Sequence, residues 1–138
     1  MTETSRLHHV VFAVPAPHHD EMAKMFTELG FQLNGGELDE LGIRVSLDWP
    51  GGIELISPLS GATTDVAASV ERFLAAHGSG VYTVVVQVPE AAAAESVTQR
   101  YGSVTRFRQQ IGGEGTHLEE IDLSVLDLPL TLLETNVP

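Results

Sequence analysis

The stretch that decides the fold is LHHVVFAVP at residues 7–15, because a segment of the same kind returns as VYTVVVQVP at residues 81–89. Both segments are rich in β-branched residues and both end at a proline, so each is predicted to be a β-strand. A repeated segment at this spacing indicates that the chain is built from two copies of one supersecondary unit.

A helical pattern follows each of these strands. Apolar residues recur at helical spacing over residues 22–29 and again over residues 93–101. Each pattern stops at a glycine, Gly30 or Gly102, the residue type that helices favour just past their ends. Three shorter extended runs then follow in each half, predicted at residues 31–33, 42–48 and 53–57 and at residues 104–108, 121–125 and 131–135.

Similar turns and a connecting helix complete the two halves. Asp48-Trp49-Pro50 and Asp127-Leu128-Pro129 are predicted to be equivalent hairpin turns. Between the halves, Thr63-Thr64-Asp65 can cap a helix that ends at Gly78. The pattern predicts an α+β chain of two βαβββ modules within a single domain, residues 1–138. Module one covers about residues 5–60, the linker helix about 64–78, and module two about 79–138.

The composition excludes several classes of function. Nineteen Asp+Glu against seven Lys+Arg give a net charge of −12, which repels phosphate backbones and anionic lipid, so neither nucleic acid nor a membrane is an expected partner. There is no cysteine, so any metal has to be held by histidines and carboxylates. The polar N-terminal stretch contains no signal or membrane segment, and a cytoplasmic location is expected.

Three stretches resemble the vicinal-oxygen-chelate superfamily, which includes glyoxalases, bleomycin-resistance proteins and extradiol dioxygenases. LHHV at residues 7–10 resembles the opening strand, in which a histidine ligates a metal, and IELISP at residues 53–58 resembles the closing strand, which supplies a second ligand. FLAAHGSGVYT at residues 73–83 is similar to the entry into the second half of methylmalonyl-CoA epimerases and 4-hydroxyphenylpyruvate dioxygenases. The resemblance implies a curved, half-open mixed sheet around a small-molecule pocket, with the helices outside.

The resemblance also implies a metal-ligand set, which this chain matches only in part. His9 and Glu54 match the ligands of the first half. In the second half Thr83 stands in place of a histidine, and a gapless match through the Asp-Leu-Pro turn places Leu133 at the position of the second carboxylate. Glu134 is a third candidate ligand if a bulge turns it inward. The implied cofactor is one divalent ion (Zn, Mn, Fe, Ni or Co), or none.

Because alternate side chains of a strand point to the same face of a sheet, the sequence predicts which residues lie on the same face as the candidate ligands. The predicted pocket-lining residues are Val11, Ala13, Ile56, Thr83, Val85, Gln87 and Leu133. Trp49 beside its turn is expected either to stack on an aromatic ligand or to anchor the hairpin. His18 and His19 are expected to be solvated, His117 to be exposed, and the glycine-rich residues 112–115 to form a loop that could close over a ligand.

These observations leave three functional hypotheses open. The first is a metal-dependent isomerase, lyase or epimerase acting at a carbon next to a carbonyl, with Glu54 as the catalytic base. The second is a metal-free protein that binds or sequesters a small molecule, as bleomycin-resistance proteins do. The third is a metal-free enzyme that uses His9 and Glu54 as an acid–base pair. A ring-cleaving dioxygenase is disfavoured, because it needs two histidines and a carboxylate around iron. A homodimer is expected.

Overall fold

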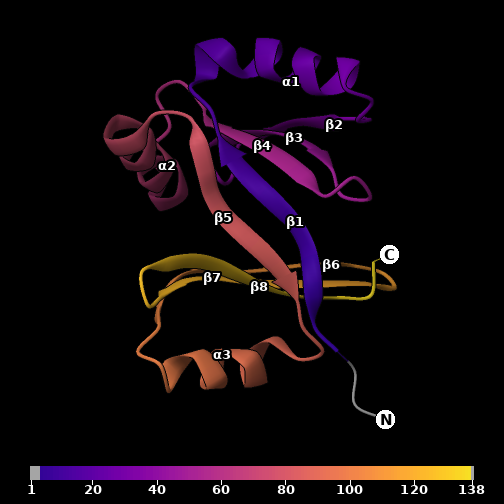
Figure 1. Cartoon of the computed structure of the whole chain (residues 1–138), viewed down its shortest axis with the longest axis vertical. Helices are drawn as coiled ribbons and strands as arrows, with labels where there is room; N and C mark the ends of the chain where they lie inside the picture. The colour runs from indigo at the N-terminus through magenta and orange to yellow at the C-terminus, as the bar shows by residue number, and fades with distance from the viewer. Residues whose placement is uncertain (1–3, 138) are drawn as a thin grey trace. The chain divides into compact units, whose positions relative to one another are not determined.

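The computed structural model describes residues 4–137, except for the side chain of residue 111 (Figure 1). No helix among the described residues is long and apolar enough to cross a membrane. Along the chain the elements are β1 (Arg6–Ala13), the short 3-10 helix η1 (Ala16–His18), α1 (His19–Glu28), β2 (Asn34–Leu38), β3 (Ile43–Asp48), β4 (Ile53–Pro58), α2 (Asp65–His77), β5 (Gly80–Gln87), α3 (Ala91–Gln99), β6 (Val104–Gly113), β7 (Thr116–Val125) and β8 (Leu128–Thr135).

The chain divides into two compact units. The first unit is His9–Tyr82, and the second is Thr83 onward together with the residues before His9. The first contains most of β1, then α1, β2, β3, β4, α2 and the start of β5, and the second contains the start of β1, most of β5, and then α3, β6, β7 and β8. The prediction of an α+β fold made from two βαβββ modules is confirmed.

The strands pair in the same way in both units. In the first unit the order across the sheet is β2-β3-β4-β1, with β1 parallel to β4 and the other pairs antiparallel. In the second unit the order is β6-β7-β8-β5, with β5 parallel to β8 and the other pairs antiparallel. The internal repeat seen in the sequence is therefore a repeat of hydrogen-bond topology.

The strand expected at residues 31–33 is wrong, and β2 forms at Asn34–Leu38 instead. The reason is that the backbone at residues 31 and 32 is already hydrogen-bonded elsewhere. Phe31 N donates to Phe26 O at the end of α1 (3.0 Å), and Gln32 N donates to Asp48 Oδ2 (3.0 Å). The Phe31 ring also packs edge-on against Phe26. The chain can join the sheet only after these contacts end.

Helix α2 begins and ends where the sequence predicted. The Thr64 hydroxyl accepts a hydrogen bond from Ala67 N (3.1 Å) and donates one to Leu41 O (2.6 Å), so one side chain caps the helix and ties it to a loop. At the other end Gly78 adopts a φ of 72°, a conformation that other residues adopt only at a cost.

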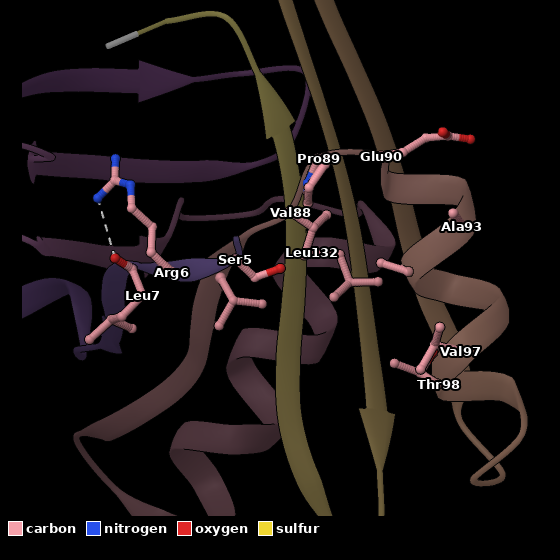
Figure 2. Close-up of a pocket in the computed structure, with 12 residues that line it drawn as sticks. Ser5, Arg6, Leu7, Val88, Pro89, Glu90, Ala93, Val97, Thr98 and Leu132 are labelled. Carbon is pink, nitrogen blue, oxygen red and sulfur yellow. Dashed lines mark hydrogen bonds between the residues drawn. The ribbon is translucent and has the colours of Figure 1, made fainter. Parts of the chain in front are cut away.

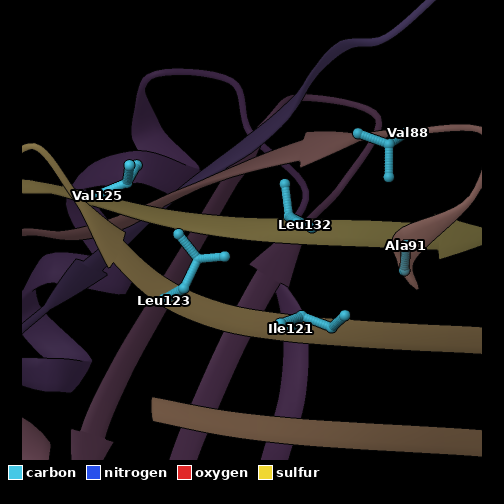
Figure 3. Packing of buried hydrophobic residues seen from close by; sticks show 6 residues of the cluster. All are labelled: Val88, Ala91, Ile121, Leu123, Val125 and Leu132. Carbon is cyan, nitrogen blue, oxygen red and sulfur yellow. The ribbon is translucent and has the colours of Figure 1, made fainter. Parts of the chain in front are cut away.

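The core of the second unit lies on the face of its sheet against which α3 packs, since α3 contacts β7 and β8. Figure 3 shows the buried side chains of this core. Six buried apolar residues make up this cluster: Val88, Ala91, Ile121, Leu123, Val125 and Leu132. Because alternate residues of a strand face opposite sides, the side chains that flank these positions in β5 and β8 lie on the other face of the sheet. Thr83, Val85, Thr131 and Leu133 belong to that other face.

Residues 112–115 do not form a loop that could close over a ligand, as the sequence suggested. The β6–β7 ladder continues through Gly112↔His117 to Gly113↔Thr116, so only Glu114 and Gly115 remain in the turn. Gly115 has a φ of 77°, which suits a tight hairpin. These glycines belong to a long hairpin. A glycine-rich composition alone does not distinguish such a hairpin from a mobile loop.

Candidate functional site

His9, Glu54 and Trp49 form one polar cluster within the first unit. His9 lies on β1 and Glu54 on the parallel neighbour β4, where Glu54 pairs with Val11. His9 Nε2 is 3.3 Å from Glu54 Oε1, with the His9 side chain 2% exposed and that of Glu54 16% exposed. The structure thus brings together the two residues that the sequence singled out, and leaves the carboxylate as the more accessible of the two.

Trp49 completes the cluster from the turn between β3 and β4. Its Nε1 donates a hydrogen bond to Glu54 Oε1 (3.1 Å). Its ring stacks on His9, with ring centroids 5.2 Å apart and an angle of 24° between the planes. The sequence suggested Trp49 as a hairpin anchor or a ligand-stacking residue, and missed its contacts with both site residues. The contacts from His9 and from Trp49 described above are both made to Oε1 of the carboxylate.

The equivalent positions of the second unit hold two threonines. Val10 pairs with Ile53 and Val84 with Leu130, so Thr83 corresponds to His9 and Thr131 corresponds to Glu54. Thr83 Oγ1 and Thr131 Oγ1 are hydrogen-bonded at 3.0 Å, and both residues are buried. An imidazole–carboxylate pair in one half is thus replaced by a neutral hydroxyl pair in the other.

The prediction that Leu133 occupies the position equivalent to Glu54 is therefore wrong. The β7–β8 hairpin continues through Ser124↔Pro129 to Val125↔Leu128, and its turn is Leu126-Asp127. Both turn residues have positive φ values, 51° and 66°, as a two-residue hairpin turn requires. This turn is not the counterpart of the longer turn at Asp48-Trp49-Pro50, so an alignment through the two turns shifts the register. Leu133 corresponds to Ile56 instead.

Glu134 lies on the face of β8 that carries Leu132 and α3, since no bulge interrupts β8. Its Oε1 accepts a hydrogen bond from Ala91 N at the start of α3 (2.8 Å), and its Oε2 is 2.7 Å from His117 Nε2. The Ala91 N–H lowers the pKa of Glu134 below its usual value, burial acts in the opposite direction, and His117 lowers the pKa further. The inward turn that a ligand role required does not occur.

The donors present do not fit the metal site that the resemblance implies. Among the described residues no group of three or more histidine or acidic side chains is placed to hold a metal ion. His9 and Glu54 supply two donors, and the equivalent pair in the second unit supplies only neutral hydroxyls that bond to each other. Imidazole and carboxylate groups suit Zn, Mn, Fe, Ni and Co, and catalytic zinc sites usually have three such ligands.

The residues predicted to line a pocket are mostly buried on the faces that the strand alternation predicted. Val11, Ala13 and Ile56 are buried on the His9 and Glu54 side of β1 and β4, and Val85 and Leu133 are buried beside the threonine pair. Gln87 lies on the same face of β5, and its Oε1 is buried with no hydrogen-bond partner among the described residues. That these residues line one ligand pocket stays a prediction.

His19 is buried at the start of α1, so the expectation that it is solvated is wrong. Its Nδ1 is 2.7 Å from Ser57 Oγ and its Nε2 is 2.8 Å from Ser46 Oγ, while Ser57 Oγ donates to Val14 O (2.6 Å). Because the Ser57 hydrogen points to a carbonyl, Ser57 accepts from His19 Nδ1–H. The neutral ring then accepts at Nε2 from Ser46.

The charge state of His19 follows from the same surroundings. Burial lowers the pKa of His19 below its ordinary 6.5, the positive charge of Arg44 lowers it further, and Asp20 acts in the opposite direction. The sequence did contain a signal: Ser46 and Ser57 each interrupt a strand of largely apolar residues. The sequence also predicted that His18 and His117 are in contact with solvent. His18 is exposed, and the His117 side chain is about half exposed.

The topology is that of the vicinal-oxygen-chelate fold, with a polar cluster on the first and last strands of one module. Solved structures confirm the fold. The chain is similar to methylmalonyl-CoA epimerase from Mycobacterium tuberculosis (24% identity, TM-score 0.67, covering 100% of this chain and 94% of that one). It is also similar to a variant of the Streptomyces coelicolor methylmalonyl-CoA epimerase in complex with 2-nitronate-propionyl-CoA (17% identity, TM-score 0.69, covering 98% and 97%).

A third similar structure carries no assigned activity. It is a hypothetical protein, BH1468, from Bacillus halodurans C-125, with 17% identity and a TM-score of 0.71 over 99% of this chain and 98% of that one. No family model and no curated protein matches the sequence. At identities of 17–24% these similarities show the fold alone.

Proposed function

We propose that this protein binds a small carbonyl compound at the His9–Trp49–Glu54 cluster and transfers a proton at the carbon next to the carbonyl. The observation that carries the proposal is the 3.3 Å contact between His9 Nε2 and Glu54 Oε1 on two parallel strands. A carboxylate held on an otherwise apolar strand is a suitable general base. Two of the similar structures are methylmalonyl-CoA epimerases, whose activity belongs to the same class of reaction.

Each residue of the cluster has a separate role in this proposal. Glu54 accepts the proton from the substrate carbon through its carboxylate, which is more exposed than the His9 side chain. The electron pair of the broken C–H bond moves to the carbonyl oxygen and forms an enolate. Return of the proton to the face that it left restores the starting compound, whereas delivery of a proton from water to the opposite face of the enolate inverts that carbon and completes an isomerisation. Trp49 holds the carboxylate through its indole N–H, and His9 supports it from the buried side.

No step of this mechanism uses a metal, because the donors do not fit one. Tag-free protein incubated with Zn, Mn, Fe, Ni or Co and then desalted is expected to retain clearly less than one equivalent, by elemental analysis. The His9→Ala variant is expected to retain the same amount. Stoichiometric metal that disappears in His9→Ala would restore the metal-dependent hypothesis.

The proposed reaction is tested by hydrogen–deuterium exchange at carbon. A panel of 2-substituted acyl thioesters and 2-oxo acids is incubated with chelator-treated protein in D2O, and loss of the α-proton signal is followed by NMR. Glu54→Gln keeps an oxygen for the Trp49 hydrogen bond but removes the base, so we expect exchange to fall by about a hundredfold. Exchange that is unchanged in Glu54→Gln, or that requires added metal, contradicts the proposal.

Binding without turnover is the second candidate function, and the Thr83–Thr131 pair favours it. Two neutral hydroxyls stand where the resemblance implies metal ligands, which suits a protein that sequesters its ligand. Trp49 is the only tryptophan of the chain, so its fluorescence reports binding at the cluster directly. Compounds that change this fluorescence while no member of the panel exchanges its α-proton would favour the binding function.

The proposal includes a homodimer, as the resemblance suggested, and a location in the cytoplasm. Sedimentation velocity over a range of protein concentrations measures the oligomeric state. A monomer at all concentrations would remove the dimer from the proposal and leave the chemistry of the cluster unaffected.

A further inference from the structure

A groove in the second unit lies along α3, on the face of the sheet opposite the threonine pair. Its volume is about 770 Å³, within the range of about 300–1,000 Å³ that small-molecule sites occupy. Figure 2 shows its walls: α3 on one side, the start of β1 on the other, and Val88 and Leu132 between them. None of its lining residues belongs to the His9–Trp49–Glu54 cluster.

The lining of the groove is aliphatic. Eight of its residues are apolar: Leu7, Val86, Val88, Pro89, Ala93, Ala94, Val97 and Leu132. The small side chains of Ala93 and Ala94 leave space along the helix. Leu7 and Val97 are both about half exposed, so apolar surface remains in contact with water there. No aromatic residue lines the groove, so an unbranched aliphatic chain suits it better than a flat ring.

The charges of the groove distinguish its two sides. Arg6 lines one side, and Glu90, just before α3, lines the other (Figure 2). Within residues 4–137, Arg6 makes one long hydrogen bond, to Leu7 O at 3.4 Å, and has no carboxylate at ion-pair distance. In a chain with a net charge of −12, an arginine that has no acidic partner among the described residues and lies beside an apolar groove complements an anion. Glu90 repels the same anion from the other side.

We propose that this groove is a second ligand site, which binds an unbranched aliphatic carboxylate with its chain along α3 and its carboxylate at Arg6. The chain covers the aliphatic lining, and Arg6 provides the charge that selects an acid over an alcohol of the same length. This inference goes beyond the proton-transfer function, since the groove lies in the second unit and shares no residue with the His9–Trp49–Glu54 cluster.

The contribution of the Arg6 charge to binding is tested with octanoate and 1-octanol. Binding of each compound to the whole protein is measured by isothermal titration calorimetry at low salt. We expect octanoate to bind, and Arg6→Ala to weaken it about fivefold or more while changing octanol by less than about twofold. Arg100→Ala is the matched control, because Arg100 is exposed at the end of α3 and does not line the groove. Equal losses for acid and alcohol, or acetate binding as well as octanoate, would overturn the proposal.

The groove itself is tested with two neighbouring alanines of α3. Ala92 and Ala93 are both exposed, but only Ala93 lines the groove. We expect Ala93→Trp to abolish octanoate binding and Ala92→Trp to leave it unchanged, with circular dichroism confirming that both variants fold. Loss in both variants or in neither contradicts the assignment. The assignment is also contradicted if the wild-type protein does not bind octanoate and Ala93→Trp changes the sedimentation of the protein. The groove is then an interface between copies of the chain.

Discussion

Thr83 Oγ1 lies 3.0 Å from Thr131 Oγ1, and these residues occupy in the second unit the strand positions that His9 and Glu54 occupy in the first. The two halves therefore share a backbone arrangement and differ in chemistry. One pair consists of an imidazole and a carboxylate, and the other consists of two neutral hydroxyls. The candidate base of the site is thus confined to the first half.

Replacing one threonine of this pair should cost more than replacing both. Thr83→Val or Thr131→Val leaves a buried hydroxyl without its partner, at a cost of about 1–2 kcal/mol, whereas the double variant removes both polar groups and keeps their shape. Urea unfolding of the wild type and the three variants measures the coupling. Strictly additive costs would show that the hydrogen bond between the hydroxyls contributes nothing to stability.

Trp49→Phe should weaken the site without unfolding it. Phenylalanine can still stack on His9, but the indole N–H that donates to Glu54 Oε1 is lost. We expect proton exchange to fall by about tenfold, which corresponds to about 1.4 kcal/mol. Added to Glu54→Gln, the same substitution should cause no further loss, because Trp49 acts through the carboxylate. A further tenfold loss in the double variant would mean that Trp49 contacts the ligand independently.

His19 should make stability depend on pH below neutrality. The pKa of His19 is lowered in the folded protein, so the unfolded chain binds the proton first as the pH falls below 6.5. The contribution of His19 to stability is therefore fully present above that pH and is lost as the pH falls through the lowered pKa. His19→Gln should flatten this decline, measured by urea unfolding at pH 5 to 7.5. His18→Gln is the control, since His18 is exposed. Parallel curves for the wild type and His19→Gln would contradict the prediction.

Glu134→Gln should destabilise α3 and leave the Trp49 fluorescence unchanged. The carboxylate accepts from Ala91 N and contacts His117, and its pKa is lowered. Its contribution is therefore present above the usual pKa of 4.5 and is lost as the pH falls through the lowered pKa. We expect a cost of about 0.5–1 kcal/mol at pH 7, with Glu119→Gln on the adjacent strand as the control. A changed Trp49 spectrum would link Glu134 to the first-unit site.

The candidate site was only partly predictable from the sequence. Strand alternation placed His9 and Glu54 on inward faces, but their contact depends on the parallel pairing of β1 with β4, which is a long-range choice. Trp49 was ambiguous because the direction of a turn side chain depends on the turn geometry. His19 was missed because its partners, Ser46 and Ser57, come from two strands far along the chain.

The sequence by itself determined the repeat, the order of strands and helices, and the ends of α2, because strand composition, helical periodicity and glycine or threonine caps act over a few neighbouring residues. Only the tertiary structure decided that Thr131, and not Leu133, is the counterpart of Glu54, and that Glu134 caps a helix. Those outcomes depend on hairpin length and strand register, which are settled cooperatively when the whole sheet pairs, and a shift of one residue reverses every side chain.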